Sequence, residues 1–200
     1  MSKVRSLYKF NKTYDLILEG IFEPASDEEL AQRKKDAPRI MLQEWLEKFY
    51  KRKDIHKNND GSYDVDGDVH ISEMMLEKLP VKFNKIGGDF WCSTNNLTTL
   101  EGAPKSVDGN FSCYDNKLTS LEGAPTTVGG YFSCSHNKLT TLEGAPKSVG
   151  GYFVCNYNKL TSLEGAPKSV DGYFVCSNNK KRFTEEDVRA VCNVEGGIYV

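Results

Sequence analysis

The residues of this chain whose types could support metal, redox or nucleophilic chemistry are six cysteines, three histidines and a short acidic run. Five of the cysteines recur every 21 residues, at Cys92, Cys113, Cys134, Cys155 and Cys176, and Cys192 falls outside that series. Zinc sites and disulfide frameworks show clustered or uneven spacings such as Cys-x-x-Cys. One cysteine per 21 residues instead predicts a buried thiol in each unit of a repeat, acting as a small hydrophobe.

The other candidates for catalysis or metal binding lack the required spacing. His56, His70 and His136 are scattered along the chain, and the run Asp64–Asp68 lacks the twelve-residue loop and final glutamate of an EF-hand. The glycine pairs at 87–88, 129–130 and 150–151 precede predicted strands rather than helices, so they favour tight turns over phosphate binding. We therefore predict a non-enzymatic protein without catalytic residues, metal or cofactor.

Composition narrows the class of partner. The chain has 26 basic and 28 acidic residues, and a net charge of −2 gives no overall attraction to nucleic acid or to an anionic membrane. No apolar run approaches the roughly 20 residues of a transmembrane helix, and the first residues lack the pattern of a secretion signal. We expect a cytoplasmic protein that binds a protein partner, without nucleic acid or membrane.

The element that must position these residues is a 21-residue repeat. Residues 139–159 read LTTLEGAPKSVGGYFVCNYNK, and residues 97–117, 118–138 and 160–180 are copies of the same unit. With weaker copies upstream, six coils begin at Val65, Ile86, Val107, Val128, Val149 and Val170. The Phe-x-Cys alternation is typical of a strand whose phenylalanines and cysteines point into the core. The Gly-Ala-Pro segment that follows excludes a helix from the return path.

The pattern Phe-x-Cys-x-x-Asn-x-Leu-x-x-Leu matches the leucine-rich repeat template. The unit resembles the short bacterial-type leucine-rich repeat, and the form N-x-L-T-x-L-E-G-A-P-K-x-V-G-G-x-F is similar to repeats in proteins of tailed, T4-like bacteriophages. The resemblance covers about residues 65–180. It implies an α+β fold, a leucine-rich repeat solenoid with one parallel β-sheet and a non-helical convex side. It also implies a phage-encoded protein in the host cytoplasm.

The two ends of the repeat need caps, because a solenoid otherwise exposes apolar faces there. We predict a helical N-terminal region over residues 1–62 and a repeat domain over 63–200, whose C-terminal cap occupies about 181–200. One N-terminal helix is expected to begin at Ser26. A second begins at Asp36–Pro38 and has an apolar face formed by Ile40, Met41, Trp45, Leu46 and Phe49. This face either packs on the first coil or binds a partner.

The C-terminal cap combines a capping-box sequence at Thr184–Asp187 with a short helix and a closing strand within residues 194–200. Near the other end, Ile17-x-Glu19-Gly20 is similar to cleavage sites of T4-like prohead proteases. Cleavage there would make the protein a virion-associated or internal head protein with a processed targeting peptide. This is the alternative to a binding protein of the host cytoplasm.

The residues that alternate with the inward phenylalanines and cysteines point outward from the predicted concave face. Aromatic residues gather there in coils that are otherwise nearly identical, and no acidic run accompanies them along the strands. The predicted partner-binding residues are Trp91, Tyr114, Tyr131, Tyr152, Tyr173, Val154, Val175 and Asn156. Tyrosine and tryptophan are favoured anchors of protein interfaces, although cross-strand stacking alone also explains a tyrosine column. The family resemblance suggests inhibition of a host protein such as a defence complex.

Overall fold

The computed structural model describes residues 26–200. The chain divides into two compact units, residues 1–52 and 53–200, and each unit is described by itself. The segment between residues 53 and 62, assigned from the sequence to the N-terminal region, falls within the second unit, because β1 (Ile55–Lys57) pairs antiparallel with β2 (Tyr63–Val65). The cleavage sequence at Glu19-Gly20 lies outside the described residues.

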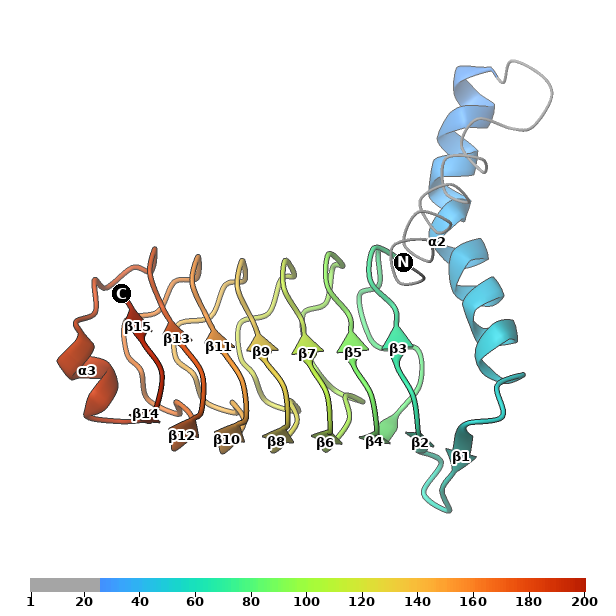
Figure 1. The fold of residues 1–200 in the computed structure, drawn as a ribbon. Helices are drawn as coiled ribbons and strands as arrows, with labels where there is room; N and C mark the ends of the chain where they lie inside the picture. Colours follow the sequence, from blue (N-terminus) through green and yellow to red (C-terminus); the bar gives the residue numbers. More distant parts are fainter. Residues whose placement is uncertain (1–25) are drawn as a thin grey trace, which may run out of the picture. The chain divides into compact units, whose positions relative to one another are not determined.

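The second unit is a parallel β-solenoid of 21-residue coils, which confirms the predicted fold class (Figure 1). Sheet A follows the order β1, β2, β4 (Phe83–Ile86), β6 (Ser106–Val107), β8 (Thr127–Val128), β10 (Ser148–Val149), β12 (Ser169–Val170) and β14 (Asn193–Val194). Sheet B contains β3 (Val69–His70), β5 (Phe90–Trp91), β7 (Phe111–Ser112), β9 (Phe132–Ser133), β11 (Phe153–Val154), β13 (Phe174–Val175) and β15 (Ile198–Tyr199).

The prediction of a single sheet is therefore wrong. Each coil contributes two short strands, because the Ser-Val or Thr-Val pair before each turn is as extended as the Phe-containing strand. When coils of equal length stack in register, every extended segment meets its own copy in the next coil. Ser148 and Val149, for example, pair with Ser169 and Val170, so any extended segment becomes a parallel ladder.

The predicted inward orientation of the phenylalanines is confirmed. Phe90, Phe111, Phe132 and Phe153 are fully buried. Their rings stack along the solenoid axis, with centroids 5.2–5.5 Å apart. The five repeat cysteines are buried beside them as free thiols. The core is thus a column that runs the length of the solenoid and holds the outer face of sheet B in fixed register.

The repeat asparagines connect successive coils, as expected from their place at the end of each strand. Asn116 Oδ1 accepts from the backbone N–H of Leu97 in the preceding coil, at 3.0 Å. Its Nδ2 donates to the carbonyl of Cys92 in that coil at 3.0 Å and to the carbonyl of Cys113 in its own at 3.1 Å. One buried amide therefore satisfies backbone groups of two coils, where an unpaired group would be costly.

The glycine of the Leu-Glu-Gly-Ala-Pro segment is required by both conformation and space. Gly144 has φ +86°, and a Cβ placed on it would lie 2.5 Å from the backbone nitrogen of Glu122 in the preceding coil. Gly61, in the turn between β1 and β2, has a similar φ of +80° but nothing within 4 Å of such a Cβ. An alanine at Gly61 would therefore meet backbone strain alone, whereas an alanine at Gly144 would meet both strain and crowding between coils.

We expect Gly144→Ala to lower the free energy of unfolding by about 2–4 kcal/mol, because the backbone of two coils must separate. Gly61→Ala adds only the strain of a left-handed conformation, about 1 kcal/mol. Denaturant unfolding of the two variants tests this expectation. Equal losses would show that the close approach at Gly144 is relieved without cost.

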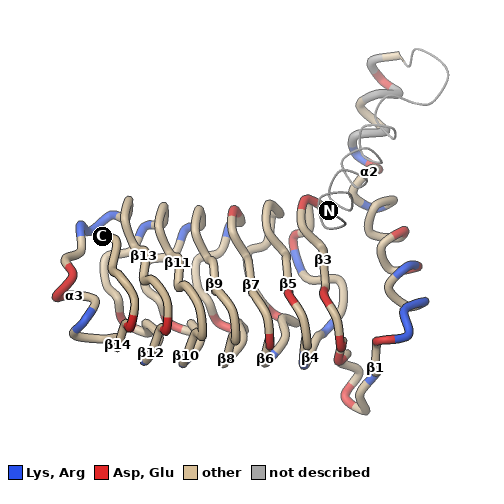
Figure 2. The backbone as a smooth tube through the Cα atoms, viewed as in Figure 1, with Lys and Arg blue, Asp and Glu red and all other residues tan. Residues whose placement is uncertain are grey.

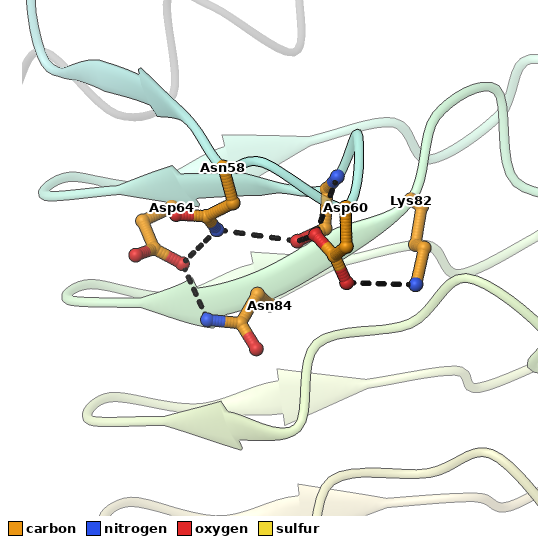
Figure 3. A network of polar contacts seen from close by, with 6 residues as sticks. Asn58, Asp60, Asp64, Lys82 and Asn84 are labelled. Atoms are coloured by element: carbon orange, nitrogen blue, oxygen red, sulfur yellow. Dashed lines mark hydrogen bonds and ion pairs between the residues drawn. The ribbon is translucent and has the colours of Figure 1, made fainter.

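The first coils are joined by a polar network around the β1–β2 turn (Figure 3). Asp64 Oδ1 accepts from Asn84 Nδ2 on β4 at 2.8 Å and from Asn58 Nδ2 at 3.1 Å. The hydrogen bond from Asn84 is the main cause that lowers the pKa of Asp64. Asp60 pairs with Lys82 Nζ at 3.0 Å. These bonds attach the antiparallel β1 to the parallel sheet and fix where the stack begins.

The C-terminal cap follows its prediction. Helix α3 (Glu185–Arg189) begins after Thr184, whose side chain accepts from the N–H of Asp187 while the Asp187 carboxylate accepts from the N–H of Thr184. Val188 and Cys192 are buried. The closing segment forms a strand in each sheet, because β14 pairs with β12 and β15 pairs with β13. The last coil is therefore complete on both faces.

The described part of the N-terminal unit contains one helix, α2 (Asp27–Phe49), and not two helices that begin at Ser26 and at Asp36–Pro38 as predicted. A proline removes one hydrogen bond from a helix. The helix continues because Ala37, Met41, Trp45 and Phe49, spaced four residues apart, are all buried on one face. The rings of Trp45 and Phe49 stack at 4.7 Å. Whether this face packs on the first coil stays a prediction.

Candidate functional site

The candidate site is the outer face of sheet B together with the turns that enter and leave it. All exposed large hydrophobic side chains within residues 53–200 lie on this face or in the turn that follows its strands. They are Met75, Tyr114, Tyr152, Tyr157, Tyr173, Tyr199 and Val200, which are between 38% and 55% exposed. None of these seven residues lies in a strand of sheet A. Apolar area is therefore concentrated on one side of the solenoid.

None of the eight predicted binding residues is in the core. Tyr114, Tyr152 and Tyr173 are exposed. The other five, Trp91, Tyr131, Val154, Asn156 and Val175, are half-buried on the same face. Ring contacts divide the aromatic residues among them into three groups rather than one continuous stripe.

The largest group, here called the C-terminal tyrosine cluster, comprises Tyr152, Tyr173 and Tyr199. The rings of Tyr152 and Tyr173 stack at 4.9 Å, and the ring of Tyr199 meets Tyr173 edge-on at 5.5 Å. A Cβ on Gly172 would lie 2.4 Å from Cδ1 of Tyr152, so the glycine leaves room for the ring to lie over the next coil. The three rings remain 50%, 40% and 55% exposed, which leaves a broad aromatic surface available for contact.

A second group forms further toward the N-terminus. The indole of Trp91 stands edge-on to the ring of Tyr131 at 6.0 Å. Ser112, which pairs with Trp91 in the intervening strand, is buried. The two aromatic side chains thus meet over a coil that carries a small residue. Burial, and then the nearby Asp89 carboxylate, raise the pKa of Tyr131.

A third group, here called the edge cluster, lies where the chain leaves sheet B. His136 stacks on Tyr157 at 4.4 Å and meets Tyr114 at 5.0 Å. The sequence pattern did not identify His136 and Tyr157. Strict alternation, continued past the end of the strand, makes theirs an inward-facing position. Both have positive φ, 53° and 52°. They immediately precede the repeat asparagine, and this position in the repeat is the signal that could have identified them.

Charge is distributed unevenly around the face (Figure 2). Residues 65–71, 86–92, 107–113, 128–134, 149–155, 170–176 and 194–200, which form the strands of sheet B and the turns entering them, contain no lysine or arginine. They contain six acidic residues, Asp66, Asp68, Asp89, Asp108, Asp171 and Glu195. The turns leaving the sheet carry exposed lysines at 117, 138, 159 and 180. The strand columns alone did not show this acidic character, because most of these carboxylates lie in the entering turns.

The cysteine thiols of the repeats are the groups best suited to nucleophilic chemistry, but they are weak nucleophiles in this fold. Burial raises the pKa of Cys113 to about 12, and it raises the pKa values of the other repeat cysteines in the same direction. The thiolate is the reactive form of cysteine, so these thiols stay protonated. Within residues 26–200, histidine, cysteine and carboxylate side chains form no group of three that could hold a metal ion.

Over the same described range, no helix is both long and apolar enough to cross a membrane. What distinguishes the surface is therefore its aromatic groups and its uneven charge, and these properties must carry any argument about function. No family model, no curated protein and no solved structure matches the chain.

Proposed function

We propose that this protein is a non-enzymatic protein-binding module whose docking surface is the outer face of sheet B. The observation that carries the proposal is the confinement of exposed large hydrophobic side chains in the solenoid to that face and its following turn. Exposed tyrosines lose unfavourable contact with water when a partner covers them, and their rigid rings give up little conformational entropy. A face used only for cross-strand stacking needs no such concentration on one side.

The repeats' resemblance to those of T4-like bacteriophages extends the proposal. On that basis the protein is phage-encoded, acts in the host cytoplasm, and inhibits a host protein such as a defence complex by occupying its surface. The alternative is a virion protein processed at Glu19. N-terminal peptides from purified particles distinguish the two roles, since a chain that begins at Gly20 inside particles supports the virion role and contradicts the inhibitor role.

The double substitution Tyr152→Ala/Tyr173→Ala tests the docking surface. We expect it to abolish capture of the partner by the tagged protein from a lysate of phage-infected bacteria. The melting temperature should change by only a few degrees, because stacked aromatic pairs contribute about 0.5–1.5 kcal/mol. Quantitative mass spectrometry of the captured proteins supplies the measurement.

Glu143→Ala/Glu164→Ala is the matched control, because both glutamates are exposed on the segment between the two sheets at the same end of the solenoid. Capture should be unchanged in this variant. Equal recovery of every protein by the wild type and the tyrosine variant would place the docking surface elsewhere. Loss in both variants would show that the loss of capture is not specific to the tyrosine surface.

A further inference from the structure

A groove runs along the corner at which the chain passes from sheet A to sheet B. It has a volume of about 390 Å³ and is lined by Val107, Asp108, Thr127, Val128, Gly129, Ser148, Val149, Gly150 and Asp171. The residue that follows the core valine is aspartate in two of these coils and glycine in the two coils between them. Gly129 and Gly150 therefore open a notch, and Asp108 and Asp171 close its two ends, roughly 14 Å apart at one strand spacing per coil.

The groove borders the aromatic surface of sheet B. In each coil the tyrosine follows the groove position by two residues, as in Tyr152 after Gly150 and Tyr173 after Asp171. The ring of Tyr152 lies against Gly172, the neighbour of Asp171. A cationic side chain in the groove would meet the carboxylates of Asp108 and Asp171 at its ends, and the Tyr152 ring lies next to the second of these ends. Lysine and arginine are attracted to both, by charge and by the electron-rich ring face.

The charges of the groove are available to a ligand to different degrees. Asp108 pairs with Lys85 at 3.2 Å, and both side chains are more than half exposed. Among residues 26–200, Asp171 forms no ion pair. Exposed pairs of this kind contribute little, so exchange of Lys85 for a partner's cation costs little. No lysine or arginine is among the residues that line the groove, which disfavours an anionic occupant such as phosphate.

We propose that this groove and the adjoining tyrosines bind a lysine- or arginine-rich segment of the partner protein. The proposal rests on the proposed docking function of sheet B and names the chemistry of the occupant. Complementary charge suppresses wrong partners and speeds association. Exposed lysines lie on both sides of the acidic entering turns, at 117, 138, 159 and 180 where the chain leaves sheet B and at 105, 147 and 168 before the strands of sheet A. The cationic segment is therefore confined to the row of entering turns that carries Asp108 and Asp171.

The probe is a fluorescein-labelled peptide of alternating arginine and serine, compared with a peptide of alternating glutamate and serine, in fluorescence anisotropy titrations at low and physiological salt. We expect only the arginine peptide to bind, with weaker binding at higher salt. Asp108→Asn/Asp171→Asn keeps side-chain shape, removes two charges and should weaken binding roughly tenfold. Glu122→Gln/Glu143→Gln removes two charges from the exposed segment between the sheets and should leave binding unchanged.

Thr127→Arg places a cation inside the groove from an exposed position on β8 and should compete with the peptide, weakening its binding roughly tenfold or more. Equal affinity of the wild type and the Asp108→Asn/Asp171→Asn variant would overturn the proposal, as would stronger binding of the glutamate peptide. Either result leaves partner capture by the tyrosine variant as a separate measurement. If the tyrosine variant loses capture while the Asp108→Asn/Asp171→Asn variant binds the arginine peptide as tightly as the wild type does, the docking surface is retained. The cationic occupant is then rejected.

Discussion

We expect Phe153→Ala to lower the free energy of unfolding by about 3–5 kcal/mol, the range for truncation of a buried aromatic side chain. Phe153 is fully buried between Phe132, on which its ring stacks at 5.5 Å, and Phe174, whose tilted ring lies at 5.1 Å. Its loss leaves a cavity in the middle of the column. Neither neighbouring ring can close this cavity, because each is held at the strand spacing by its own coil. Denaturant unfolding followed by circular dichroism measures the change.

Tyr152→Ala is the matched control, since it removes an aromatic ring from the adjacent position of the same coil. That ring is 50% exposed, so the expected loss is about 1 kcal/mol. A loss below 1 kcal/mol for Phe153→Ala would contradict the inward orientation of the phenylalanine column. A larger loss of unfolding free energy for Tyr152→Ala than for Phe153→Ala would show that the tyrosine faces the core and the phenylalanine faces outward.

The second large effect is expected at the asparagine column. Asn137 accepts from the N–H of Leu118 at 3.0 Å and donates to the carbonyls of Cys113 and Cys134 at 3.0 and 3.1 Å. Both carbonyls keep a second amide donor, from Asn116 and Asn158 respectively. Asn137→Ala therefore leaves the Leu118 N–H as the principal unpaired group, opens a small void, and should cost about 3 kcal/mol.

Asn179→Ala provides the comparison, because the same amide at the last repeat is only half-buried. Water can replace part of its hydrogen bonding, so we expect a loss of about 1 kcal/mol. Thermal and denaturant unfolding of the two variants measures both values. If the losses are equal, burial within the stack does not determine the contribution of the asparagines.

Much of this architecture was determined by the sequence alone. The 21-residue spacing fixed the coil length, the alternation of phenylalanine and cysteine fixed which side chains enter the core, and Thr184–Asp187 marked the start of α3. These features depend on local periodicity and on chemistry within one coil. A repeat of constant length can stack only on itself, so local pattern and global fold agree.

The tertiary structure decided the features that form only between neighbouring coils. The second sheet arises because in-register coils align every extended segment. Tyr199 joins Tyr173 only when the closing strand takes its place beside β13. His136 and Tyr157 come together through left-handed backbone positions after the strand. The groove exists because two glycines and two aspartates from four coils align at one corner. Residues 21 or more positions apart become neighbours only through the register of the coils, and local propensity does not encode that geometry.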